Sequence, residues 1–81
     1  MQAMAPKTKK KDPRVAELRA LGERIQRWRR EQHLTQAVLA EKLDISVAYV
    51  SLIERGGRNP PITTVSAIAR ALGVSTAMLV E

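Results

Sequence analysis

The apolar residues of this chain recur at steps of three and four, the spacing that places side chains on one face of an α-helix. The most regular stretch spans residues 36–54 and reads QAVLAEKLDISVAYVSLIE, with Asp44 interrupting the pattern near its middle. Thr35 and Ser46 stand where each half needs an N-cap. Ala40 supplies the small side chain that two steeply crossing helices need at their closest approach. The window therefore predicts a helix-turn-helix, with its second helix at about residues 46–55.

A long helix is expected before this window. Asp12 and Pro13 form a start signal, and the helix should run to about Gln32, where His33 suits a left-handed terminating position. The stripe expected to face the core consists of Val15, Leu18, Leu21 or Gly22, Ile25 and Trp28.

Two more helices are expected after the window. Pro60 and Pro61 lead into a fourth helix that ends at Gly73, with Ile62, Val65, Ile68, Ala69 and Leu72 on its apolar face. Ser75 caps a short fifth helix that contains Met78 and Leu79. The pattern as a whole predicts an all-α domain of five helices over residues 12–81.

Composition limits the chemistry that such a domain can carry. With 81 residues, no Cys and a single His, the chain offers neither a disulfide framework nor a zinc site, and no run is apolar enough for a membrane span. No nucleophile is paired with a base, and Gly56 and Gly57 fit no nucleotide-binding motif. We expect no enzyme activity, no cofactor, no membrane association and no small-molecule effector, in a protein of the cytoplasm.

Most of the net charge of +6 lies at the N-terminus, where the first 14 residues hold one acidic residue, Asp12, and five basic ones: Lys7, Lys9, Lys10, Lys11 and Arg14. Residues 1–11 have no apolar pattern, so we expect a disordered basic tail. Such a tail can serve solubility alone, or it can act as an arm that follows DNA phosphates or enters the minor groove.

The segments LGERIQRWRREQHLTQ, LAEKLDIS, YVSLIERGGRNP and IARALGVS together resemble the XRE or Cro-like helix-turn-helix family, which has the fold of the lambda repressor N-terminal domain. Asp44 replaces the Gly that relatives often carry at the corner, but Asp also tolerates the left-handed conformation. The resemblance implies a bacterial or phage-type, nucleoid-associated transcriptional regulator that binds double-stranded DNA. It also implies a structural ion pair between Arg29 and Glu54.

The resemblance further assigns residues to the DNA surface. Bases would be read in the major groove by Val47, Ala48, Ser51 and Leu52. The DNA backbone would be contacted by Thr35, Gln36, Tyr49, Arg55, Arg58 and Asn59. Relatives usually form two-fold dimers, for which the candidate surface is the fifth helix with the end of the fourth: Val74, Met78, Leu79 and Val80.

The expected reading face departs from the family in its chemistry. Many relatives carry Gln, Arg or Lys at these positions, which grip a purine with two hydrogen bonds, whereas this chain has Val, Ala and Leu. Apolar side chains can still contact thymine methyl groups, and DNA shape can add selectivity. The alternative is that Val47 and Leu52 face a protein partner, so that the same fold serves as a protein–protein interaction module.

Overall fold

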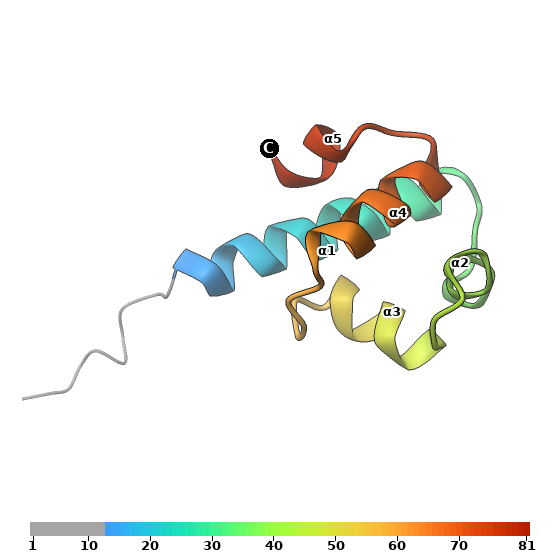
Figure 1. Cartoon of the computed structure of the whole chain (residues 1–81), viewed down its shortest axis with the longest axis horizontal. Helices are drawn as coiled ribbons and strands as arrows, with labels where there is room; N and C mark the ends of the chain where they lie inside the picture. The colour runs from blue at the N-terminus through green and yellow to red at the C-terminus, as the bar shows by residue number, and fades with distance from the viewer. Residues whose placement is uncertain (1–12) are drawn as a thin grey trace, which may run out of the picture.

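A computed structural model describes residues 13–81, and this part of the chain is entirely helical, without strands (Figure 1). The five helices are α1 (Pro13–Glu31), α2 (Gln36–Leu43), α3 (Val47–Glu54), α4 (Ile62–Leu72) and α5 (Thr76–Val80). The all-α, five-helix prediction is therefore confirmed. The predicted Asp12 cap and the basic tail over residues 1–11 lie outside the described residues. Within 13–81, no helix combines the length and apolar character that crossing a membrane requires.

The long helix α1 forms the centre of the arrangement. It contacts α3, α4 and α5, while α2 contacts α3 and α4. Figure 1 shows α2 and α3 on one side of α1 and α5 on the other. Within the helix-turn-helix pair, α3 thus packs against α1 and α2 packs against α4.

Short polar side chains begin three of the helices, as predicted. The Thr35 hydroxyl accepts a hydrogen bond from the backbone N–H of Val38 at 3.0 Å, and the Ser46 hydroxyl accepts one from Tyr49 at 3.0 Å. The Ser75 hydroxyl accepts one from Met78 at 3.3 Å. Each cap satisfies a donor that the first turn of a helix leaves without a partner.

Residues in the left-handed conformation end the first four helices. His33 has a φ of 60° after α1, and Asp44 has a φ of 58° at the corner between α2 and α3. Gly56 and Gly73 follow α3 and α4 with φ values of 78° and 72°. The predictions for His33 and for a left-handed Asp44 are confirmed, and the corner forms without glycine.

The core lies between α1 and the other helices. Its most completely buried large side chains are Ile25, Leu39, Ile53, Ile68 and Leu79. Trp28 and Tyr49 are half-buried and pack against this cluster, as expected of aromatic residues in a small domain.

Two residues expected in the core are exposed instead. Val15 is 51% exposed because the first turns of α1 extend beyond the helices that cover the rest of it (Figure 1). Ile62 is 65% exposed, although it follows the helical spacing of Val65 and Leu72, because it is the first residue of α4. The apolar spacing predicted both helices, but the other helices do not cover these two side chains.

Two small residues, Gly22 and Ala40, are buried inside helices. Ala40 is 2% exposed and belongs to the core. Gly22 has no side chain where α1 meets the end of α3, and a Cβ atom there would overlap the carbonyl oxygens of Ile53 and Glu54. We expected Gly22 only as part of the apolar stripe. It is in fact the point where the α1 backbone touches α3.

Candidate nucleic-acid interface

The residues expected to read bases lie on one side of α3 but differ in exposure. Val47 is 45% exposed and Ala48 is also exposed, so both protrude from the first turn of the helix. Ser51 and Leu52 are half-buried, and Gly57 lies close to the Leu52 side chain. The accessible part of this face is therefore its N-terminal turn, not the whole length of α3.

The residues expected at the DNA backbone lie at the start of α2, where Gln36 bonds to the last residue of α3, and directly after α3. Thr35 is exposed at the start of α2, while Arg55, Arg58 and Asn59 are exposed directly after α3. Tyr49 is the exception, because its ring packs against the core.

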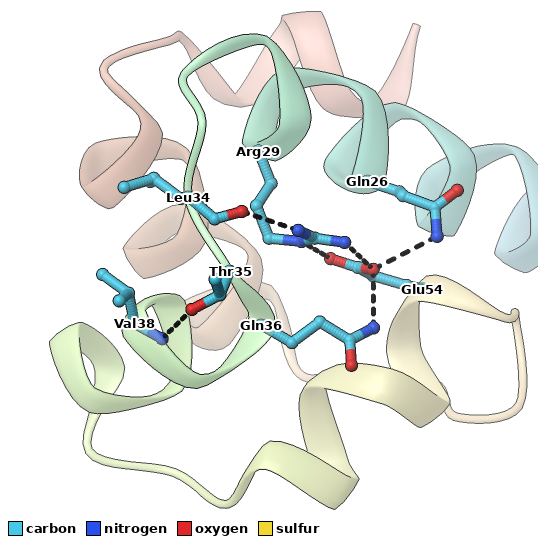
Figure 2. A network of polar contacts seen from close by, with 7 residues as sticks. All are labelled: Gln26, Arg29, Leu34, Thr35, Gln36, Val38 and Glu54. Carbon is cyan, nitrogen blue, oxygen red and sulfur yellow. Dashed lines mark hydrogen bonds and ion pairs between the residues drawn. The ribbon is translucent and has the colours of Figure 1, made fainter.

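Arg29 and Glu54 form a buried ion pair that links α1 to the last residue of α3 (Figure 2). Arg29 Nε donates to Glu54 Oε2 at 2.6 Å, and Arg29 Nη2 donates to Glu54 Oε1 at 3.0 Å. The two side chains are only 7% and 0% exposed. Arg29 Nη1 also donates to the Leu34 carbonyl oxygen at 2.7 Å, which ties the segment between α1 and α2 into the same network.

Two glutamines complete the coordination of the Glu54 carboxylate. Gln36 Nε2, at the first residue of α2, donates to Oε1 at 2.9 Å, and Gln26 Nε2 on α1 donates to the same oxygen at 3.4 Å. Figure 2 shows Arg29, Gln26 and Gln36 converging on Glu54 from different directions. Sequence reasoning missed both contacts and assigned Gln36 only to a phosphate. The spacing of Gln26 and Arg29, which puts them on one face of α1, was the available signal.

These contacts keep both partners charged. Burial by itself would raise the pKa of the Glu54 carboxyl, but the hydrogen bonds from Arg29, Gln36 and Gln26 and the Arg29 charge outweigh burial and lower the pKa below its ordinary value. The hydrogen bond to Glu54 raises the pKa of Arg29, against a smaller opposing effect of burial. The pair is therefore ionised throughout the neutral range, and it joins α1 and α2 to the C-terminal end of α3.

The surface expected to form a dimer needs one correction. Leu79 is completely buried, so it belongs to the core and not to a surface patch. Met78 and Val80 are 44% and 49% exposed, and Val74 is half-buried. Val80 also lines a groove of about 630 Å³ between α1 and the start of α4, a feature that sequence reasoning did not anticipate.

Known proteins share both the sequence pattern and the fold of this chain. The helix-turn-helix family model HTH_3 matches residues 25–79. The chain belongs to this helix-turn-helix family. It is 43% identical over 60 residues to the immunity repressor protein of Bacillus phage phi105, a match that covers 74% of this chain and 42% of the repressor. The chain thus spans less than half the length of that relative.

Solved structures of similar proteins have the same fold. The restriction-modification controller protein C.AhdI from Aeromonas hydrophila aligns with a TM-score of 0.76 and 31% identity, over 79% of this chain and 97% of that one. The biofilm master regulator SinR, solved in complex with DNA, aligns with a TM-score of 0.71 and 34% identity, over 75% and 98% of the two chains. The resemblance to XRE and lambda-repressor-like proteins is confirmed, and with it membership of a family of DNA-binding transcriptional regulators.

Proposed function

We propose that this helix-turn-helix protein is a sequence-specific transcriptional regulator that places α3 in the major groove of double-stranded DNA. The observation that carries the proposal is the exposed N-terminal turn of α3, a helix whose last residue is held to α1 by the buried Arg29–Glu54 pair. Helix-turn-helix proteins contact base edges with the first residues of the second helix. The similarity to SinR, whose structure was solved in complex with DNA, supports DNA as the partner of this chain.

Groups suited to phosphate lie at the start of α2 and directly after α3. At the start of α2, Thr35 and Gln36 combine polar side chains with the N–H groups and positive dipole of a helix N-terminus. After α3, Arg55, Arg58 and Asn59 supply two positive charges and an amide. The Tyr49 hydroxyl can reach the groove edge while its ring stays in the core. In this arrangement these contacts set the position of α3 on the duplex and contribute affinity more than sequence preference.

The network around Glu54 would give this surface its rigidity. Gln36 binds Glu54 through its amide nitrogen, so the proposed phosphate contact at the start of α2 is mechanically connected to the end of α3. A change in the angle of α3 would then displace Gln36 as well. We therefore assign Arg29 and Glu54 a positioning role.

A two-fold homodimer is part of the proposal. Met78 and Val80 leave an apolar surface at the end of α5, beside the half-buried Val74. Pairing this surface across a two-fold axis would bury it and would present two α3 helices to half-sites about one helical turn apart.

Salt-titrated binding to duplex DNA tests the function directly. Fluorescence anisotropy with a labelled random-sequence duplex should show affinity at low salt that falls linearly on a log–log plot as salt rises, because bound phosphates release counterions. Selection from a random duplex pool should then return a two-fold symmetric site. A folded protein without measurable affinity at low salt would overturn the proposal and favour the second candidate, a protein partner on the exposed face of Val47.

A further inference from the structure

We propose that the first turn of α3 selects its site by the C5-methyl group of a pyrimidine, with Val47 as the specificity-determining residue and Ala48 beside it. The inference rests on the proposed function and names the chemistry that the exposed face recognises. The shared ligand chemistry is a methyl group in the major groove, which thymine carries and which 5-methylcytosine carries as well.

The helix α3 has few polar side-chain groups before its last residue. Between Val47 and Ile53 the only polar side-chain groups are the hydroxyls of Tyr49 and Ser51. The Tyr49 ring packs against the core and Ser51 is half-buried, whereas Val47 and Ala48 are exposed. No side chain in this stretch of the helix can form the paired hydrogen bonds that distinguish a purine.

Side chains able to donate hydrogen bonds to bases lie after α3. Arg55, Arg58 and Asn59 lie after the last residue of α3, at the opposite end from Val47. Leu52, the other apolar candidate, has its side-chain tip close to Gly57 and is half-buried. The groups that would meet base edges at the N-terminal turn are therefore methyl groups.

The energetics of that contact discriminate between bases. An apolar side chain pressed against the polar edge of a base displaces water without replacing its hydrogen bonds, which is unfavourable. The same side chain against a C5-methyl group removes apolar surface from water, and each buried methyl group corresponds to roughly a fourfold gain in affinity. Val47 thus favours a methylated pyrimidine over any other base at the contacted position.

The experiment uses duplexes that differ by single methyl groups. In the highest-ranked selected site, each thymine is replaced in turn by deoxyuridine, which removes the C5-methyl and leaves the pairing edge unchanged. In a second series, 5-methylcytosine replaces cytosine in sites that carry cytosine at the same positions. Affinity is measured at one fixed salt concentration for the wild type, Val47→Ala and Val15→Ala. Val15 is the matched control, since it is an exposed valine on a different helix.

For the wild type, we expect the affinity to fall roughly fourfold when uracil replaces thymine at one or two positions in each half-site, or to rise by that factor when 5-methylcytosine replaces cytosine there. The uracil arm identifies thymine as the source of the methyl group and the methylcytosine arm identifies the modified base. In Val47→Ala, the ratio of the affinities with and without the methyl group should fall to near one, while Val15→Ala should keep the wild-type ratio. The inference would be overturned if removing or adding the methyl group left the affinity unchanged in both series, or if the methyl effect survived in Val47→Ala. Selection without any sequence preference would also overturn it. In each of these cases DNA binding itself remains. Absence of binding to every duplex would instead overturn the proposed function.

Discussion

Glu54 is a charged residue that is buried and held by several hydrogen bonds. Its carboxylate is fully buried and accepts hydrogen bonds from Arg29, Gln36 and Gln26. A buried ion pair adds less to net stability than its close geometry suggests, because both ions lose water. Removing one partner has a larger effect, since the remaining charge stays buried without compensation.

The first prediction concerns this charge. Arg29→Ala should lower the free energy of unfolding by about 3–5 kcal/mol, as measured by urea denaturation, because Glu54 is left uncompensated. The control is Arg27→Ala, which removes an exposed pair to Glu31 at 3.6 Å and should cost no more than about 0.5 kcal/mol. Equal effects of the two substitutions would show that the buried network does not carry the energy assigned to it.

The second prediction is a pH dependence of stability. The pKa of Glu54 is lower in the folded chain than the ordinary value of 4.5, so the unfolded state binds the proton more readily. The contribution of Glu54 is fully present above that ordinary value and is lost as the pH falls through the lower folded-state pKa. Urea denaturation at a series of acidic pH values should show this decline, and Glu54→Gln should have a shallower one. A Glu54→Gln curve as steep as the wild type would assign the acid sensitivity to other carboxyls.

At the scale of helices, the contact between α1 and α3 depends on Gly22. Glycine inside a helix normally costs stability compared with alanine, by about 0.5–1 kcal/mol. Here the carbonyl oxygens of Ile53 and Glu54 occupy the space that a Cβ would need. The close approach also brings the end of α3 to the helix that carries Arg29, so the packing and the ion pair support each other.

The third prediction follows from that approach. Gly22→Ala should destabilise the fold by about 1–3 kcal/mol, because α1 and α3 would have to separate. The control is Gly57→Ala, where a Cβ would lie 3.3 Å from the tip of the Leu52 side chain and 3.4 Å from the Leu52 carbonyl oxygen, so that a shift of a few tenths of an ångström by the side-chain tip relieves the contact. Thermal denaturation monitored by circular dichroism compares the two variants. A stabilised Gly22→Ala protein would mean that the helices are farther apart than described here.

At the scale of the whole molecule, charge and apolar surface are distributed unequally. The chain has a net charge of +6, and exposed arginines follow α3 directly, while an apolar surface remains at the end of α5. The proposed DNA contact and the proposed dimer contact therefore use different faces, so each can be tested without the other.

The fourth prediction separates electrostatic positioning from base recognition. Arg58→Ala should weaken binding to all duplexes alike and reduce the slope of the salt dependence by about one unit, because one phosphate contact is lost. Arg27→Ala on α1 serves as the control of equal charge change and should leave the slope unaltered. A change in sequence preference in Arg58→Ala, at constant slope, would contradict the backbone assignment.

The fifth prediction addresses assembly. Val80→Asp should shift sedimentation equilibrium toward the monomer and lower DNA affinity at low protein concentration, since a charge would enter the apolar contact. Val15→Asp introduces the same charge at another exposed valine and should leave assembly unaffected. A Val80→Asp protein that still forms dimers would place the dimer contact elsewhere.

Features that depend only on neighbouring residues could be predicted from the sequence. Caps at Thr35, Ser46 and Ser75 act over three residues, and the left-handed turn at Asp44 depends on local backbone sterics, so both could be predicted without tertiary information. Helical periodicity likewise predicted most of the core, and the family motifs predicted which segment would form the helix-turn-helix.

Features that depend on distant segments could not be predicted, because the packing of the helices sets them. Gln26 and Gln36 lie 28 and 18 residues from Glu54, and only the packing of α1 and α2 against α3 brings their amides to its carboxylate. Burial is decided in the same way: Leu79 is enclosed and Val15 is exposed because coverage depends on where other helices end, not on the apolar period. The chain specifies its helices through short-range interactions, whereas the mutual fit of those helices determines which side chains are buried, paired or free to meet DNA.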